Sequence, residues 1–305
     1  MCGAALGISW RYHPAVSRLK NLNDYDVIVV ENCLAAILPI RRRFTGKLIF
    51  HVHADNIHAG NPDVQKAIQA CDGIFAVSKF IARRILDVAP NAPVEVLLNG
   101  IETDAYQLRC REQDSKRVVI GYVGRLTAAK GVDKLLDAFI GLKSAHKDWN
   151  LSLRIVGGSA FKGGLENEYT AMLKEKARPY DRWITFTGFI DHECIAEEFV
   201  KCDVIVVPSQ CNEALPLSVA EAMASGCLVV ATKIGGIPEI QNNDRYLVEP
   251  SENYVEALMQ ALEIAVEDIF QGRFTMQTAR ERIAKYFNGS NYLRSMMRLI
   301  ENINK

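Results

Sequence analysis

The feature that most constrains the fold is a repeated alternation of short β-branched segments with longer amphipathic ones. A segment such as 27–30 (Val-Ile-Val-Val) is apolar at every position, which is typical of a parallel strand buried on both faces. A segment such as 79–88 has the apolar spacing of a helix. Because parallel strands need a long crossover connection, usually a helix, the sequence predicts an α/β protein with parallel sheets.

The alternation runs in two series, separated by a polar and charged stretch from 102 to 117 that we expect to be a linker. The first series predicts strands at 27–30, 48–53, 73–77 and 94–98, with helices at 63–71 and 79–88. The second predicts strands at 118–123, 151–156, 184–187, 204–207 and 228–231. Its helices are expected at 132–144, 165–177, 192–200, 217–224, 254–267 and 276–303, the last interrupted at 287–290. We therefore expect two doubly wound, Rossmann-like domains.

Composition argues against several classes of function. The 36 lysines and arginines balance the 36 aspartates and glutamates, so no net charge draws the chain to nucleic acid. No apolar run approaches the roughly 20 residues that span a bilayer, and the first eight residues lack the features of a signal peptide. The eight cysteines are scattered without a CxxC pair, which favours reduced thiols over a disulfide framework or a zinc site. We expect a cytoplasmic protein.

The strongest chemical signal follows the expected strand at 204–207. Ligands of open α/β sheets bind beyond the carboxyl ends of strands, and Glu213 stands in that position. Pro216 suits the first position of the next helix, whose free amides, such as that of Leu217, favour a phosphate. Glu213 and Glu221 could accept the hydroxyls of a sugar or a ribose. The alternative is that both are ordinary helix acids, but the strand and the small residues around Glu221 favour a site.

A second signal is the loop after the expected strand at 118–123. Gly124 allows close backbone approach, while Arg125 and Lys130 offer a guanidinium fork and an ammonium for the oxygens of a diphosphate. The alternative is a pair of ordinary surface cations. The glycine-rich stretch at 156–164 does not fit the GxGxxG fingerprint, so an NAD site is not favoured.

Together these stretches resemble the donor-binding domain of glycosyltransferase family 4, whose fold is the two-domain GT-B fold. The similarity rests on Gly124-Arg125-Leu126, Lys130-Gly131, Val156-Gly157-Gly158, Gly188-Phe189-Ile190, Glu213 and Glu221 with seven residues between them, and Gly235-Gly236-Ile237-Pro238-Glu239. In the first series, Asn99-Gly100-Ile101-Glu102 resembles the segment before the family's linker.

The resemblance implies a role for each matching position. It assigns the donor diphosphate to Arg125, Lys130 and Leu217, the donor sugar or ribose to Glu213, Leu215 and Glu221, the base to Ile190, and a sugar-facing position in the first domain to His53. Glu213 and His53 are the implied catalytic residues. Transfer in the family retains the anomeric configuration and generally needs no metal, so we expect neither a metal nor another cofactor.

The resemblance also implies a domain plan with the active site in a cleft between two domains. We expect an acceptor-side domain at 1–109, a nucleotide-sugar-binding domain at 110–288, and a helix at 289–305 that crosses back to the first domain. The first domain looks shortened, because only about two dozen residues precede the equivalent of Asp26. Pro216 stands where the family often has glycine, which removes one amide donor.

The implied function is retaining transfer of a hexosyl or N-acetylhexosaminyl group from a donor, expected to be UDP-linked, to a glycan or lipid-linked acceptor. The closest resemblance is to bacterial enzymes of lipopolysaccharide or surface-polysaccharide synthesis. A non-catalytic nucleotide-sugar-binding partner and a GT-B epimerase or phosphorylase are the alternatives. A lipid-linked acceptor would bring peripheral contact with the inner face of the plasma membrane, although the run Arg41-Arg42-Arg43 itself favours a solvated turn.

Two patterns resemble metal sites but favour other interpretations. His51 and His53 lie two apart on one strand and face the same side, yet the sequence offers no obvious third ligand. Contact of His53 with donor or acceptor is therefore favoured. The triplet Asp24-Tyr25-Asp26 resembles a DxD motif, and we interpret it as a turn before the first strand.

Overall fold

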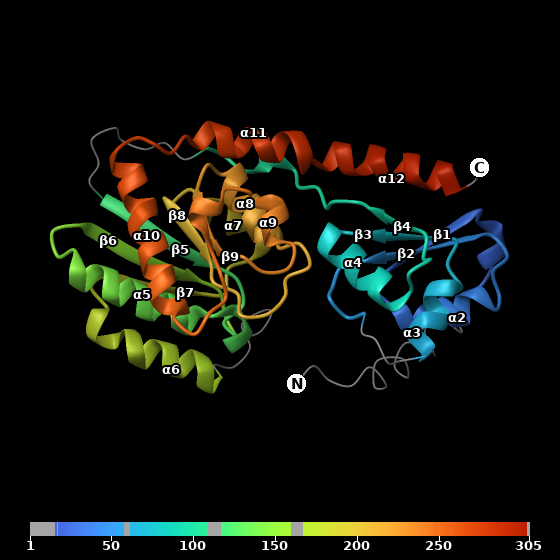
Figure 1. Cartoon of the computed structure of the whole chain (residues 1–305), viewed down its shortest axis with the longest axis horizontal. Coiled ribbons are helices and arrows are strands. Elements are labelled where there is room, and N and C mark those ends of the chain that lie inside the picture. The colour runs from blue at the N-terminus through green and yellow to red at the C-terminus, as the bar shows by residue number, and fades with distance from the viewer. Residues whose placement is uncertain (1–15, 17, 58–61, 109–116, 160–166, 304–305) are drawn as a thin grey trace. The chain divides into compact units, whose positions relative to one another are not determined.

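The computed structural model describes residues 16, 18–57, 62–108, 117–159 and 167–303 (Figure 1). The chain divides into two compact units. Unit 1 comprises residues 1–99 and 290–305, and unit 2 comprises residues 100–289. Each unit contains its own parallel sheet. The α/β class expected from the alternation of strands and helices is confirmed.

The sheet of unit 1 has four parallel strands in the order β1-β2-β3-β4. They are β1 (Val27–Glu31), β2 (Lys47–Val52), β3 (Gly73–Ala76) and β4 (Val94–Val96), each within two residues of its expected position. Nearly every residue of β2 and β3 is buried. Burial on both faces explains why these strands read as continuous apolar runs in the sequence.

Helices cover the sheet of unit 1. α2 (Leu34–Arg41), α3 (Pro62–Gln69) and α4 (Lys79–Val88) connect strands that follow one another in order. Right-handed crossovers place all three on one face. The other face carries α12 (Gly289–Ile303) (Figure 1). Its Tyr292, Met296, Leu299, Ile300 and Ile303 pack against buried Ile49, Phe75 and Leu97.

Helix α2 was not expected from the sequence. Its segment contains Pro39, a residue that lacks the amide proton of a regular helical turn and therefore argues against a helix. In the structure Pro39 lies inside the eight-residue helix, close to its end. Burial of Ile37 and Ile40 offsets the lost hydrogen bond.

The sheet of unit 2 has six parallel strands in the order β10-β9-β8-β5-β6-β7. They are β5 (Arg117–Val123), β6 (Asn150–Val156), β7 (Ile184–Gly188), β8 (Val204–Val207), β9 (Leu228–Thr232) and β10 (Leu247–Val248). The two-residue β10 was not expected. The chain builds outward from β5 in one direction and then from β8 in the other, so the strand order reverses between β5 and β8. Such a reversal is the topological switch point of a doubly wound sheet.

The helices of unit 2 enclose a large apolar core. They are α5 (Val132–Ala145), α6 (Glu168–Ala177), α7 (Ile195–Phe199), α8 (Leu217–Ala224), α9 (Ile237–Ile240), α10 (Tyr254–Phe270) and α11 (Met276–Tyr286). The expected helix at 192–200 begins instead as a 3-10 turn, η5 (His192–Cys194), and α9 was not expected. Phe139 of α5 and Leu262 of α10 are fully buried in this core with the inward side chains of β5 and β6.

The two segments by which the chain enters and leaves unit 2 are hydrogen-bonded to each other. Ile101 N–H donates to the carbonyl of Phe287 at 2.7 Å, and Gly289 N–H donates to the carbonyl of Ile101 at 3.0 Å. Ile101 and Asn288 form a parallel bridge. Gly100 packs closely here, because a Cβ on it would lie 2.7 Å from the Asn288 carbonyl oxygen.

The end of α10 is fixed by a buried carboxylate. Asp268 is 1% exposed and accepts hydrogen bonds from Arg245 Nε at 2.7 Å, Tyr246 Oη at 2.9 Å and Arg273 Nε at 2.5 Å. Burial alone would raise the pKa of Asp268, but these donors outweigh it and lower the pKa to about 2. The carboxylate thereby joins α10 to η6 (Asp244–Tyr246) and to the chain after α10.

We expect Asp268→Asn to reduce the acid sensitivity of the fold. The pKa of Asp268 is lower in the folded chain than its ordinary value of about 3.9, so its stabilising effect is complete above that pH. That effect is lost as the pH falls toward 2. The asparagine variant should be less stable at neutral pH and lose less stability between pH 5 and pH 2, measured by urea unfolding. Asp148→Asn, at an exposed position, is the control, and equal acid slopes in all three proteins would contradict the assignment.

Candidate functional site

The candidate site lies at the switch point of unit 2, where β5 and β8 end side by side. β5 and β8 pair through Ile120 with Val204 and Gly121 with Ile205. The loop after β5 carries the cations expected to bind a phosphate, and the loop after β8 carries Glu213. Because parallel strands share an edge at their carboxyl ends, this pairing brings together two segments that lie about 85 residues apart in the sequence.

Close contact of two glycines shapes the floor of the site. Gly157, after β6, has φ +138°, and a Cβ on it would lie 1.8 Å from the carbonyl oxygen of Gly124, after β5. Gly124 N–H donates to Val156 O at 3.0 Å, and Leu126 N–H donates to Gly158 O at 2.9 Å. Only glycine at 157 permits this approach, which leaves the backbone exposed toward the site.

A cavity of about 320 Å³ opens over these glycines. It is lined by Val123, Gly124, Arg125, Val156, Gly157, Gly158, Phe189, Ile190, His192, Ile195, Ser218 and Glu221. Three of the predicted site residues, Arg125, Ile190 and Glu221, therefore line the same cavity. Its volume falls at the lower end of the range for small-molecule sites, which is about 300–1,000 Å³.

Glu221 is buried on the cavity side of α8, with 8% of its surface exposed. The interpretation of Glu221 as a solvated helix acid is therefore wrong. Burial raises the pKa of Glu221, while a hydrogen bond from Tyr106 and the nearby His192 oppose that rise. Tyr106 comes from the segment before β5 and was not nominated by the sequence, because nothing local marks it as a partner of a residue so far along the chain.

Glu213 is held between two loops by several contacts. Its carboxylate forms an ion pair with Lys130 Nζ and accepts a hydrogen bond from Ser209 Oγ at 2.5 Å. Its carbonyl accepts from Gly236 N–H at 2.7 Å. Gly235 has φ +58°, and a Cβ on it would lie 2.2 Å from the Glu213 carbonyl oxygen, so this close approach requires glycine.

Arg125 and Glu213 lie on the same side of their unit, near one tyrosine. Tyr122 Oη donates to the carbonyl of Arg125 at 2.6 Å. Burial raises the pKa of Tyr122, the Glu213 carboxylate raises it further, and the Arg125 guanidinium lowers it. The charges of Glu213 and Arg125 thus both act on the hydroxyl of Tyr122. The ion pair of Lys130 with Glu213 joins the loop after β5 to the loop after β8.

The start of α8 differs in detail from the expectation. Pro216 precedes the helix as its N-cap, with φ −73° and ψ 113°, and Leu217 is the first helical residue. The prediction that Pro216 occupies the first helical position is therefore wrong by one residue. Leu217 is 39% exposed and Ser218 lines the cavity, so the positive end of α8 faces the site. Leu215 is buried and does not line the cavity.

His53 follows β2 in unit 1 and belongs to a cluster of three polar side chains. His53 Nε2 lies 2.6 Å from Glu31 Oε2 and 3.1 Å from His51 Nδ1. His51 is fully buried, and burial and the neighbouring His53 lower its pKa against the opposing effect of Glu31. The sequence offered no third ligand beside the histidine pair. The structure supplies Glu31, because it ends β1 in register with His51.

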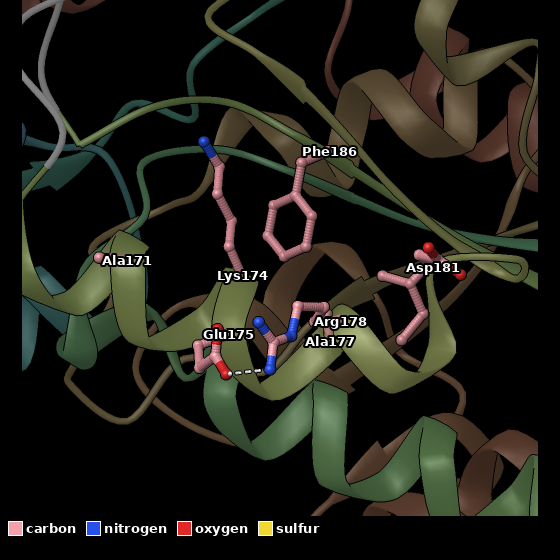
Figure 2. Close-up of a pocket in the computed structure, with 8 residues that line it drawn as sticks. Ala171, Lys174, Glu175, Ala177, Arg178, Asp181 and Phe186 are labelled. Atoms are coloured by element: carbon pink, nitrogen blue, oxygen red, sulfur yellow. Dashed lines mark ion pairs between the residues drawn. The ribbon is translucent and has the colours of Figure 1, made fainter.

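A second cavity in unit 2, of about 490 Å³, contains none of the nominated residues (Figure 2). It lies along α6 and β7 and is lined by Ala171, Lys174, Glu175, Ala177, Arg178, Asp181, Ile184 and Phe186. Figure 2 shows Arg178 turned toward Glu175, its partner in an ion pair at 3.1 Å. β7 is an edge strand, and the switch point of the sheet lies between β5 and β8, so this cavity is not at the position where ligands of doubly wound sheets bind.

The other sequence features have structural roles. Arg41 pairs with Asp72 and donates to the carbonyls of Phe44 and Gly46, while Arg43 donates to the carbonyls of Val16 and Leu19. Arg41 is the last residue of α2, and Arg42 and Arg43 form the exposed turn after it, so the expected turn covers only the last two residues of the run. The triplet 24–26 joins the 3-10 turn η1 (Leu22–Asp24) to β1, also as expected. Among the helices in the described part of the chain, none is long and apolar enough to span a membrane.

Two family models match the chain. Residues 117–268 match the model described as "Glycosyl transferases group 1", and residues 3–105 match the model described as "Glycosyltransferase Family 4". The first match spans most of unit 2 and includes the loops after β5 and β8 and the helix α8.

Two relatives of the chain are named as sugar transferases. A Bacillus subtilis protein named as a glycosyltransferase, YtcC, is 27% identical over 296 residues, covering 90% of this chain and 72% of that protein. The lipopolysaccharide 1,2-N-acetylglucosaminetransferase of Salmonella typhimurium is 28% identical over 243 residues, covering 74% of this chain and 61% of that protein.

Among solved structures, the Anabaena protein Alr3699/HepE in complex with UDP and glucose superposes with a TM-score of 0.74 at 18% identity, covering 98% of this chain and 83% of that chain. At this level of identity the likeness shows the fold. The GT-B fold expected from the sequence resemblance is confirmed.

We expect Tyr106→Phe to raise the pKa of Glu221 further. The hydroxyl of Tyr106 stabilises the charged carboxylate, and its loss leaves burial less opposed. The titration of the Glu221 side-chain carboxyl, followed by 13C NMR, should shift to higher pH in this variant. Tyr286→Phe, at an exposed tyrosine, serves as the control. An unchanged Glu221 titration in Tyr106→Phe would show that the hydrogen bond does not set its pKa.

Proposed function

Because the chain belongs to the glycosyltransferase family that these two models describe, we propose that it transfers a sugar from a nucleotide-sugar donor to a glycan or lipid-linked acceptor, with retention of anomeric configuration. The observation that carries the proposal is the convergence of the cationic loop after β5 and the acidic loop after β8 at the switch point of unit 2. Ligands with a diphosphate suit this geometry, because cations and the N-terminus of α8 lie beside carboxylates that accept hydroxyls.

In this proposal the donor diphosphate is bound by Arg125, by Lys130 and by the amides at the start of α8. Arg125 supplies a planar fork that matches phosphate oxygens, and Lys130 supplies a compact charge. These groups neutralise the charge that develops on the leaving diphosphate, so we propose that no metal is needed there. The base lies near the backbone of Ile190, which lines the cavity.

Glu213 and Glu221 have different tasks in the proposed complex. Glu221 is buried in the cavity and accepts the ribose hydroxyls. Glu213 holds hydroxyls of the transferred sugar, together with the backbone at Leu215. Lys130 and Glu213 neutralise each other in the structure. Donor binding would exchange that ion pair for two new contacts, Lys130 to phosphate and Glu213 to sugar, so neither charge is left unpaired.

The proposed chemistry is a front-face displacement. The bond between the anomeric carbon and the phosphate oxygen breaks, and the acceptor hydroxyl oxygen bonds to the anomeric carbon on the same face. The proton of that hydroxyl passes to the departing phosphate oxygen. The family resemblance implies that His53 faces the sugar, and in this proposal His53 helps to orient the donor. The contribution of the protein is positioning and electrostatic stabilisation.

A UDP-linked donor and an acceptor from cell-surface polysaccharide or lipopolysaccharide synthesis are the finer parts of the proposal. They are supported by the UDP bound in the Anabaena complex and by the lipopolysaccharide substrate named for the Salmonella relative. We place the reaction in the cytoplasm, at the inner face of the plasma membrane when the acceptor is lipid-linked.

We expect Arg125→Ala to weaken donor binding by about 10- to 100-fold, because hydrogen bonds to charged groups contribute about 1.5–3 kcal/mol. A thermal-shift screen identifies the donor first, since a ligand of the folded state raises the melting temperature. Calorimetry then gives its affinity. Arg178→Ala, whose side chain is 76% exposed beside the second cavity, is the matched control. Equal affinities of the two variants would remove Arg125 from the diphosphate site.

We expect Glu213→Gln to separate binding of the nucleotide from binding of the sugar. The variant should bind UDP as tightly as the unchanged protein, or more tightly, because Lys130 is no longer paired with a carboxylate. It should bind the UDP-sugar more weakly and transfer radiolabelled sugar to the acceptor much more slowly. Transfer at the original rate would contradict the role of Glu213. Donor binding by the unchanged chain without any transfer would favour the non-catalytic alternative.

A further inference from the structure

We propose that Glu31, His51 and His53 form a binding site for a divalent transition-metal ion of the zinc class. One oxygen of Glu31 lies 3.0 Å from His51 Nδ1 and 2.6 Å from His53 Nε2, and the two nitrogens are 3.1 Å apart. Three atoms that can each donate a lone pair to a cation thus lie within 4.8 Å of one another. Two imidazoles and a carboxylate are a ligand set that suits zinc and its neighbours.

Two of the three ligands lie on strands, and the third, His53, directly follows β2. Glu31 and His51 are register partners on the adjacent parallel strands β1 and β2, so their side chains leave the sheet on one face. Asn32, at φ +52°, turns the chain after β1. Its N–H donates to the carbonyl of His51 at 2.8 Å, and its side-chain oxygen accepts from His53 N–H at 3.2 Å. Ligands fixed in this way bind a metal with little reorganisation.

The observed spacing fits a tetrahedral site after a small outward movement of Glu31. Metal–ligand bonds of about 2.0–2.1 Å place tetrahedral ligand atoms about 3.3 Å apart. The spacing of the two nitrogens is already close to this value, and the distance that must open most is the 2.6 Å contact with Glu31. The Glu31 side chain is 53% exposed and can move, whereas buried His51 stays in place. Three protein ligands leave the fourth position for water.

The surroundings of His51 hold its ring while leaving the cluster accessible. The ring of Tyr292 from α12 stacks on the ring of His51, with 6.2 Å between the ring centroids. The ring of Phe75 meets the His51 ring edge-on, with 6.1 Å between centroids. Both belong to unit 1. The side chain of His53 is 31% exposed, so a hydrated ion can reach the cluster past His53 and Glu31. A fixed inner ligand and two accessible outer ligands give the ion an entry path.

The cluster differs from an ordinary pair of a histidine with a carboxylate. His146 and Glu263 in unit 2 form such a pair at 2.7 Å, with the ring of His146 stacked on Trp149. Among the residues that the structure describes, no third ligand joins that pair to form a metal-binding group. The His146–Glu263 pair therefore serves as a control for metal binding, because it has the same kinds of side chain but one ligand fewer.

The proposal is tested by metal binding to the full chain, freed of metal by a chelator and without an affinity tag. Titration with Co²⁺ should give the visible absorption of a tetrahedral site with one ion per chain, and no thiolate charge-transfer band. Titration with Zn²⁺ in a calorimeter should give the same stoichiometry. No activity is measured, so the outcome is separate from that of the proposed transferase function.

His53→Ala and Glu31→Gln are the test variants, because both positions are partly exposed and the fold should tolerate them. Each should weaken Zn²⁺ binding by more than about 100-fold, since loss of even an outer partner costs about 10- to 100-fold. His146→Ala should bind as the unchanged chain does. Melting temperatures establish that each variant is folded.

Three results would overturn the proposal. They are the absence of saturable Co²⁺ or Zn²⁺ binding by the unchanged chain, equal binding by folded His53→Ala, and an equal loss of affinity in His146→Ala. Without metal binding, the cluster would be a hydrogen-bonded triad in which Glu31 orients both imidazoles.

Discussion

The parallel pairing of β5 with β8 is the constraint on which the candidate site depends. It reverses the strand order of unit 2 and sets two loops side by side that the sequence keeps far apart. The Lys130–Glu213 ion pair spans those loops, and the start of α8 faces the same place. None of these groups would form a site alone. Their convergence follows from the order of the strands, and a different order with the same strands would scatter them.

Much of this arrangement was predictable from the sequence, because local patterns have local causes. The apolar runs of β2 and β8 reflect burial on both faces, and the spacing of apolar residues gave α4 and α8 at their observed bounds. Helix α2 could not be predicted as easily, because Pro39 argues against a helix and only burial in unit 1 reverses that preference. The short β10 and α9 depend on tertiary pairing rather than on a pattern.

The contacts that the sequence could not supply are those that depend on register and on covering side chains. Glu31 becomes a neighbour of His51 only when β1 and β2 pair in one particular register. Tyr106 contacts Glu221, although more than a hundred residues separate them in the sequence. Burial raises the pKa of the Glu221 carboxyl, and the hydrogen bond from Tyr106 opposes that rise. Such partners have no local signature, so the residue types of a site were predictable while much of their electrostatic environment was not.

The bridge between Ile101 and Asn288 has a consequence for how the chain is organised. Unit 2 is an insertion within unit 1, because α12, which follows unit 2 in the sequence, packs on the sheet of unit 1 against Ile49 and Phe75. The two segments by which the backbone enters and leaves unit 2 are hydrogen-bonded to each other through Ile101, Phe287 and Gly289. A fragment that ends at Asn99 would leave an apolar sheet face uncovered, whereas unit 2 could be excised as one continuous piece. Dissection of the chain should therefore begin with unit 2.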